Sequence, residues 1–177
     1  MNCRLTNWSK ECETNLNKQI NLEYWASYQY DYMWTYFDKS DVALPYIAEY
    51  FKKAAEEERE HAHKLIEYQN LRGGNVVLTD IKNISLNFLN GVPNSNPLLL
   101  SFEKALDMEQ VVYKSLLDLH QIASDENDAQ FADFLEGTYL NEQVEAINQI
   151  SKYISQIKMI GQDGHGLWNF NQNLKSE

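Results

Sequence analysis

The chain has 177 residues and a mass of 20.7 kDa, the size of one domain, and residues 1–177 are expected to form a single domain. Hydrophobic residues make up 44% of the chain and charged residues 23%, proportions that argue against a membrane protein and against a disordered chain. The 26 acidic and 15 basic residues leave a net charge of -11, the wrong sign for a protein that binds nucleic acid. Cations are the more natural partners.

The first residues, Met1 to Asn15, are polar and charged, without the apolar core of a secretory signal. No later segment approaches the roughly 20 apolar residues of a membrane-spanning helix. We therefore expect a cytoplasmic protein that has no membrane partner, although a leader removed from a longer precursor stays an open alternative. Cys3 and Cys12 are too few and too close together in the sequence to stabilise a fold by disulfide bonds, and they are expected to be free thiols.

The first half of the sequence predicts two long helices. The first runs from about Ser9, whose hydroxyl suits a helix N-cap, to about Asp38, in a polar stretch. The second begins at Pro45, which suits the first helical position, and ends at Gly73 and Gly74.

The second half predicts two more long helices and a short one. The third helix runs from Pro97 to about Ser124, and the fourth is a continuous helix from about Asp128 to Ile160. A short fifth helix is indicated by apolar residues at spacings of three and four, Leu167, Phe170 and Leu174.

The connections between these helices predict the topology. Short turns join the first helix to the second and the third to the fourth, so each pair should be antiparallel. Between the second and third lie about 22 residues, Asn75 to Asn96, which at roughly 3.3 Å per residue can travel the whole length of the bundle. The expected fold is therefore all-α, a four-helix bundle with a long crossover between helices two and three and a short fifth helix at the C-terminus.

Polar residues interrupt the apolar stripe of each long helix. Glu23 lies in the stripe of the first helix, Glu58 and His61 in the second, Glu109 in the third and Gln143 in the fourth. Counting residues from the helix ends puts all of them at one height near the middle of the bundle. We expect them to converge there.

Buried carboxylates point to a metal centre. Three of them in an apolar interior are costly unless cations or protons neutralise them. Glu58-x-x-His61 is the unit that, with a Glu from a facing helix, holds pairs of iron or manganese ions in bundles. A repeat of this unit in the fourth helix would need a His at position 146, which is Ala146, so the second ion should have fewer ligands. A lone Glu-x-x-His also occurs by chance, and the agreement of four helices is what favours the metal.

The chain resembles ferritins, specifically the heavy-type, ferroxidase-bearing chains of animals. The likeness extends from about Asn15 to Leu174 and rests on six segments: Gln19-Ile20-Asn21-Leu22-Glu23, Ala26-Ser27-Tyr28, Asp41-Val42-Ala43-Leu44, Glu57-Glu58-Arg59-Glu60-His61-Ala62, Gln69-Asn70-Leu71-Arg72-Gly73-Gly74 and Tyr139-Leu140-Asn141-Glu142-Gln143. It implies a ferritin-like bundle that assembles as a cage of 24 copies, oxidises Fe(II) with dioxygen and stores a ferric mineral. Co-assembly with other ferritin chains is left open.

The resemblance also assigns residues. It implies two iron ions per subunit, the first held by Glu23, Glu58 and His61, the second approached by Glu109. Assisting roles fall to Glu57, Gln143 and the tyrosine Tyr30.

Further assignments concern the path and fate of the iron. The resemblance places Asp133 and Glu136 in a three-fold channel with His120 near it, and Glu57 and Glu60 on the inner surface where mineral nucleates. The chain departs from the family at Gly137, an unusual residue inside a helix, which suggests tight packing or local flexibility of the helix there.

Two other functions compete with a ferroxidase. One is a cage subunit that stores iron without oxidising it, although such chains lose the carboxylate or His ligands that are present here. The other is a di-metal carboxylate oxidase with the same bundle but no cage.

Overall fold

A computed structural model describes residues 5, 7–81, 96–161 and 164–176 of the chain. Over these residues it contains helices and no strand. The helices are α1 (Lys10–Phe37), α2 (Pro45–Leu71), α3 (Pro97–Asp125), α4 (Ala129–Leu135), a π-helical segment η1 (Glu136–Leu140), α5 (Asn141–Ile160), α6 (Gly164–Asn173) and a closing 3₁₀ turn η2 (Leu174–Ser176). The all-α fold is confirmed.

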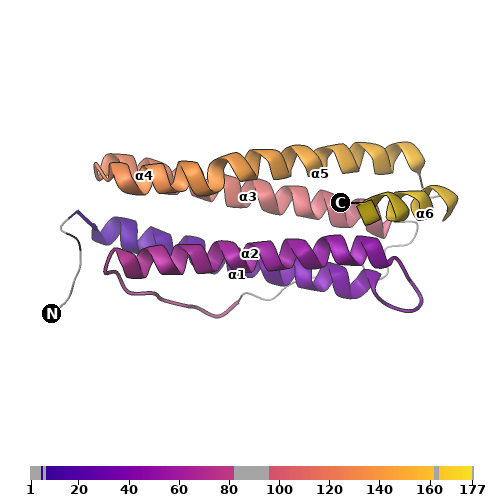
Figure 1. The fold of residues 1–177 in the computed structure, drawn as a ribbon, viewed down its shortest axis with the longest axis horizontal. Helices are drawn as coiled ribbons and strands as arrows, with labels where there is room; N and C mark the ends of the chain where they lie inside the picture. The colour runs from indigo at the N-terminus through magenta and orange to yellow at the C-terminus, as the bar shows by residue number, and fades with distance from the viewer. Residues whose placement is uncertain (1–4, 6, 82–95, 162–163, 177) are drawn as a thin grey trace.

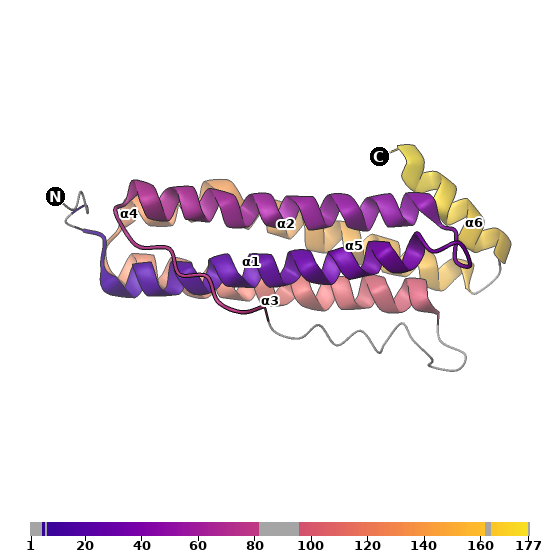
Figure 2. The same cartoon turned by 90° about the horizontal axis from the view of Figure 1, so that it is seen from below.

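The helices form one elongated bundle (Figures 1 and 2). α1 and α2 are antiparallel neighbours joined by a short turn, and α3 is antiparallel to α4 and α5. α3 begins at the end of the bundle where α2 also begins, so α2 and α3 run in the same direction (Figure 2). α6 lies across that same end. This is the arrangement expected from the long crossover, whose residues 82–95 lie outside the described part of the chain.

Local capping explains where most of the helices begin. The side chain of Ser9 accepts from the backbone N–H of Cys12 at the start of α1, and Asn96 does the same for the first residues of α3. Asp128 caps α4 through Phe131 N. The expected starts at Ser9, Pro45, Pro97 and Asp128 are therefore confirmed to within the ordinary spread of helix ends.

α2 has no cap of its own, because Leu44 precedes its Pro45. Asn171 of α6 supplies the missing acceptor: its Oδ1 accepts from Tyr46 N and from Ile47 N, each at 3.1 Å. Asn171 is buried, so this cap also fastens the C-terminal helix to the bundle.

The fourth helix is not continuous, which corrects the expectation of a single helix from Asp128 to Ile160. Its middle, Glu136–Leu140, is a π-helical turn between α4 and α5. A π turn inserts one extra residue, so it rotates everything after it by about 100°. Tight packing does not explain Gly137, because a Cβ added there would meet no atom within 4 Å. Gly137 lies within the π turn, and the space beside its Cα is open.

Two aromatic clusters fill the ends of the core. At one end Phe51 stacks on Phe37, and Phe102 packs against Tyr153 and Phe170. At the other end Trp8, Tyr68 and Phe131 contact one another, and Phe134 stacks on Tyr68. Each buried aromatic ring stabilises the fold by roughly 1.5–3 kcal/mol. The middle of the bundle lies between these clusters, and there buried Glu, Gln and His side chains interrupt the apolar core.

A buried ion pair joins α2 to α4 at the second of these ends. Arg72, just after α2, donates to both carboxylate oxygens of Asp128 at 3.1 and 2.5 Å. Its guanidinium also lies over the ring of Trp8, 4.6 Å from the centroid. The same Asp128 caps α4, so one carboxylate serves two elements.

The beginning of the crossover is held by α1. Asn17 donates to Asn75 O and accepts from Val77 N, both at 2.9 Å. One turn later Asn21 donates to Val77 O and accepts from Thr79 N, both at 2.8 Å. Two side-chain amides thus pair with alternate residues of an extended segment.

Candidate metal centre

Three side chains from two antiparallel helices meet in the middle of the bundle. Glu23 comes from α1, and Glu58 and His61 lie one turn apart on α2. Each offers a ligand atom within 4.8 Å of the other two, and all three are buried. Two carboxylates and an imidazole at this separation form a donor set that suits a divalent transition metal such as iron.

The hydrogen bonds leave part of this donor set unused. Gln19 donates to Glu23 Oε1 at 2.8 Å, whereas the buried Oε2 of Glu23 meets no hydrogen-bond donor among the described residues. Oε2 of Glu58 is equally unpartnered and lies 3.6 Å from His61 Nδ1. The carboxyl groups of Glu23 and Glu58 are near enough to share a hydrogen bond when one of them is protonated. Buried polar atoms without partners are rare in proteins, and a bound cation is one way to satisfy them.

A second polar group adjoins the first. Glu109 of α3 accepts hydrogen bonds from the hydroxyl of Tyr30 and from Nε2 of Gln143. Gln143 also donates to the backbone oxygen of Glu109 at 3.1 Å. All three side chains are buried, so four helices contribute to the polar middle of the bundle.

Burial dominates the acid–base behaviour of these carboxylates. It raises the pKa of Glu23 and of Glu58 well above the ordinary range, and the charges of Glu58 and Glu109, respectively, add to the effect. Burial also raises the pKa of Glu109, against the hydrogen bonds from Tyr30 and Gln143, which lower it. The centre therefore favours either protons or a cation.

The remaining residues singled out from the sequence lie elsewhere. Glu57 and Glu60 are on the exposed side of α2. Asp133 on α4 and Glu136 in the π turn are also exposed, and Glu136 Oε1 is 2.6 Å from His120 Nε2. These residues form no part of the buried centre.

Two contacts of His61 were not foreseen. Glu142 Oε1 lies 3.3 Å from His61 Nε2, although the helical phase points Gln143 inward in place of Glu142. The hydroxyl of Tyr139 donates to the backbone oxygen of His61 at 3.0 Å, and the two rings meet edge to face. Glu142 is half exposed and lies at the border of the centre, so both Glu142 and the buried Gln143 can approach the centre.

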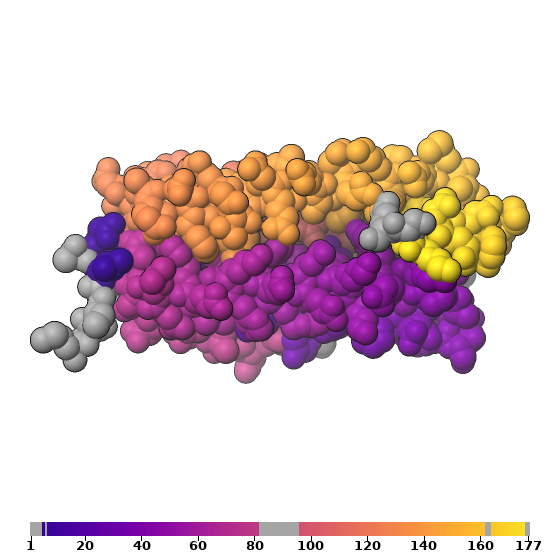
Figure 3. All heavy atoms as spheres, in the orientation of Figure 1, coloured from indigo at the N-terminus to yellow at the C-terminus, as the bar shows by residue number. Residues whose placement is uncertain are grey.

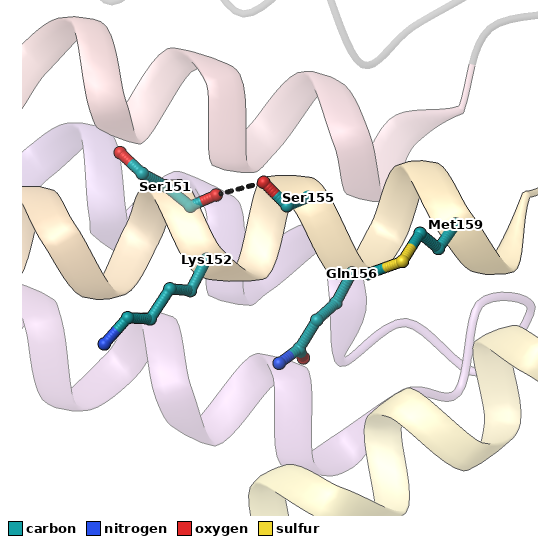
Figure 4. A pocket seen from close by; sticks show the side chains of 5 residues that line it. All are labelled: Ser151, Lys152, Ser155, Gln156 and Met159. Atoms are coloured by element: carbon teal, nitrogen blue, oxygen red, sulfur yellow. Dashed lines mark hydrogen bonds between the residues drawn. The ribbon is translucent and has the colours of Figure 1, made fainter.

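Surface hollows are separate from this centre. One lies on α5 and is lined by the side chains in Figure 4, Ser151, Lys152, Ser155, Gln156 and Met159. It lies on one face of a single helix, and its one internal bond runs from Ser155 Oγ to the backbone oxygen of Ser151. In the space-filling view the side chains of α2, α4 and α5 make up most of one face of the bundle, with α6 at one end (Figure 3).

The sequence matches the family described as Ferritin-like domain over residues 13–160. The chain belongs to the ferritin family. It is similar to chloroplastic ferritins of plants: 48% identical over 168 residues to that of Malus baccata var. xiaojinensis, and 47% identical over 167 residues to that of Phaseolus vulgaris. These alignments cover 95% and 94% of the chain but 66% and 65% of the relatives, so the chain spans slightly less than two thirds of their length.

These ferritin relatives correct the expected location of the protein and limit the assignment to the ferritin family as a whole. Their names place these relatives in chloroplasts, and by this comparison the cytoplasmic location expected from the sequence is wrong. They support the ferritin family and not the animal heavy-type chain in particular. Within the described residues, no helix combines the length and the apolar character needed to cross a lipid bilayer.

Proposed function

We propose that this ferritin chain is an iron-storage subunit with ferroxidase activity. The observation that carries the proposal is the buried group of Glu23, Glu58 and His61, in which one oxygen of each carboxylate accepts no hydrogen bond from the described residues. The charge of Glu109 on α3 raises the pKa of Glu58 in this group. The proposed type is therefore the ferroxidase-bearing one, as in heavy-type chains.

The substrate is Fe(II), bound in pairs. Glu23, Glu58 and His61 hold the first ion, and Glu109 approaches the second, with Gln143 and Tyr30 orienting Glu109 through their hydrogen bonds. Each Fe(II) gives up one electron, and the two electrons together reduce one molecule of dioxygen by two electrons. Binding of the cations displaces protons from carboxyl groups whose pKa is raised.

The second ion should leave easily. Position 146 holds Ala146 on α5, so no second His is present where a repeat of the Glu-x-x-His unit would place one. Fewer ligands hold an ion less firmly. This favours release of Fe(III) for storage, with Glu57 and Glu60 as the acidic surface on which mineral begins to form.

A cage of 24 subunits is the proposed assembly. Asp133 and Glu136, exposed beside His120, would line a three-fold channel and attract cations through their combined negative charge. The compartment that the relatives' names point to is a plastid.

The test of the function is stopped-flow absorbance after Fe(II) is mixed with aerobic protein. Glu58→Gln keeps the shape of the side chain but removes a charged ligand. We expect the initial oxidation rate to fall at least about 10-fold, because loss of a residue that only supports a metal ligand already costs about 10- to 100-fold in metal affinity or activity. Glu49→Gln, the same change at an exposed position of α2, should oxidise iron at the wild-type rate. Equal rates in the wild type and Glu58→Gln would reject the ferroxidase and favour the non-catalytic storage subunit.

Two further measurements address the assembly and the channel. Size-exclusion chromatography separates a cage from a lone bundle of 20.7 kDa, which is what a di-metal oxidase without a cage would be. Asp133→Asn combined with Glu136→Gln should lower the initial rate at low ionic strength, and added salt should lower the wild-type rate, because screening weakens attraction of the cation. A double variant as fast as the wild type would refute the channel.

A further inference from the structure

Gln19 is a fully buried side chain beside the metal centre whose role the proposed function leaves open. It lies one helical turn before Glu23 on α1, and its Nε2 donates to Glu23 Oε1 at 2.8 Å. Its other end accepts a hydrogen bond from Ser115 Oγ of α3 at 2.5 Å. The amide is therefore held at both ends, by two different helices.

Glu23 and Ser115 together fix the orientation of the amide: the ionised carboxylate only accepts hydrogen bonds, and the hydroxyl of Ser115 engages the opposite end. The Gln side chain has an oxygen that only accepts and an NH₂ group that only donates. With the hydroxyl of Ser115 donating to the oxygen, the NH₂ group is the end that faces Glu23. The reversed amide would set two acceptor oxygens against each other and would leave the carboxylate without its donor.

This contact divides the two oxygens of Glu23 between two tasks. Oε1 is engaged by Gln19, while Oε2 is buried and meets no hydrogen-bond donor in the described part of the chain. Glu23 is also one of the three side chains whose ligand atoms converge within 4.8 Å. One oxygen is thus held by the protein, and the other remains for a ligand.

We propose that Ser115 and Gln19 form a positioning relay that engages Glu23 Oε1 and leaves Oε2 as the single oxygen that Glu23 gives to a divalent cation. The inference rests on the proposed function, since it concerns the ligand geometry of the same centre. The relay begins on α3, the helix that also carries Glu109, so the orientation of Glu23 on α1 depends on the position of α3.

The electrostatics of Glu23 agree with this arrangement. Burial and then the charge of Glu58 raise its pKa, and the hydrogen bond from Gln19 opposes that shift. A donor aimed at a carboxylate stabilises its ionised form, which is the form that binds a cation.

Anaerobic titration with Co(II) tests the relay, because binding can be followed by calorimetry and the ligand geometry by the visible spectrum of the ion, without any iron oxidation. Gln19→Met keeps the length of the side chain but removes the donor, and we expect the affinity for Co(II) to fall about 10- to 100-fold. The spectrum should change as well, since a released Glu23 can bind through both oxygens. Ser115→Ala should shift both readouts in the same direction, and Ser115→Thr, which retains a hydroxyl, should restore them.

Gln69→Met is the matched control. Gln69 is also a fully buried Gln held at both ends, by Trp8 Nε1 and by the backbone oxygen of Glu13, but it is not among the residues of the metal centre. We expect this variant to lower the thermal midpoint while leaving the affinity and spectrum of Co(II) unchanged. A purely structural Gln19 would behave in the same way, so wild-type affinity and spectrum in Gln19→Met would overturn the relay.

The remaining outcomes are also decisive. Should Gln19→Met fail to fold, Ser115→Ala carries the test, and wild-type Co(II) binding in that variant overturns the relay. A wild-type chain that binds Co(II) with relay-dependent affinity but does not oxidise Fe(II) supports the relay and defeats the ferroxidase. A wild-type chain without any Co(II) site overturns both.

Discussion

Arg72 and Asp128 form a buried ion pair that joins the C-cap of α2 to the N-cap of α4, with two hydrogen bonds between the guanidinium and the carboxylate. Each charge is neutralised by the other, so removal of one partner leaves an uncompensated charge in the interior. The pair lies at the opposite end of the bundle from α6 (Figure 1).

Arg72→Met should therefore destabilise the chain by about 3–5 kcal/mol, the usual cost of breaking a buried pair. The measurement is the thermal unfolding midpoint at a fixed protein concentration. Lys114→Met, which breaks the exposed pair with Asp118, is the control and should cost no more than about 0.5 kcal/mol. Similar midpoints for the two variants would contradict the expectation that breaking the buried pair costs more stability than breaking the exposed one.

The metal-free chain should lose stability as the pH rises through the acidic range. Burial raises the pKa of Glu23 and Glu58 in the folded chain, so between the ordinary carboxyl pKa of 4.5 and the raised values the folded state binds more protons than the unfolded one. The stabilisation is full below the ordinary pKa and is lost as the pH passes the raised values. Glu58→Gln should weaken this dependence and raise the midpoint of the metal-free chain at neutral pH.

Thermal scans in the presence of a chelator, repeated with added Co(II), measure this effect. Co(II) should raise the midpoint of the wild type and leave that of Glu58→Gln nearly unchanged, since a ligand stabilises only the state that binds it. A wild-type midpoint that rises with pH across the acidic range would show that these carboxyl groups are not protonated as expected.

Gly137→Ala should stabilise the chain by up to about 1 kcal/mol, because alanine is the better helix former and the added Cβ meets no atom within 4 Å. Gly161→Ala is the matched comparison: Gly161 ends α5 with a φ of 67°, so alanine should destabilise there. Both effects are read from the thermal midpoint. A loss of stability in Gly137→Ala would mean that the π turn itself requires glycine.

Asn171→Ala should cost about 0.5–2 kcal/mol, the value of an N-cap, because it removes the acceptor for Tyr46 N and Ile47 N. It should also loosen α6, which hydrogen exchange of the α6 amides would detect. Asn173→Ala, at an exposed position of the same helix, should leave exchange unchanged. Equal protection of α6 in both variants would show that apolar packing of Phe170 is enough to hold it.

Much of the fold follows from local sequence signals. Ser9, Pro45 and Pro97 mark helix starts by their own chemistry, and the number of residues between helices decides which of them are antiparallel. The π turn could not be foreseen in this way, since a one-residue insertion leaves hydrophobic periodicity intact on either side of it. Gly137 was its one visible signal.

The candidate centre was foreseen to a similar extent. Counting residues from the helix ends correctly brings Glu23 beside Glu58, and Glu109 beside Gln143. The approach of Glu142 to His61 depends on how α5 is rotated after the π turn, which helical periodicity does not report. The relay through Ser115 depends on side-chain orientation across two helices, and no spacing rule encodes it.

The amides of Asn17 and Asn21 have a consequence for how this chain can vary. Four of their hydrogen bonds reach main-chain atoms of Asn75, Val77 and Thr79, which every residue type except proline offers, and one more comes from the hydroxyl of Thr79. Substitutions at residues 75–79 other than to proline can therefore keep these backbone contacts, whereas a change at either asparagine would remove them. The position of this segment is therefore determined by side chains of α1, which precede it in the sequence by more than fifty residues.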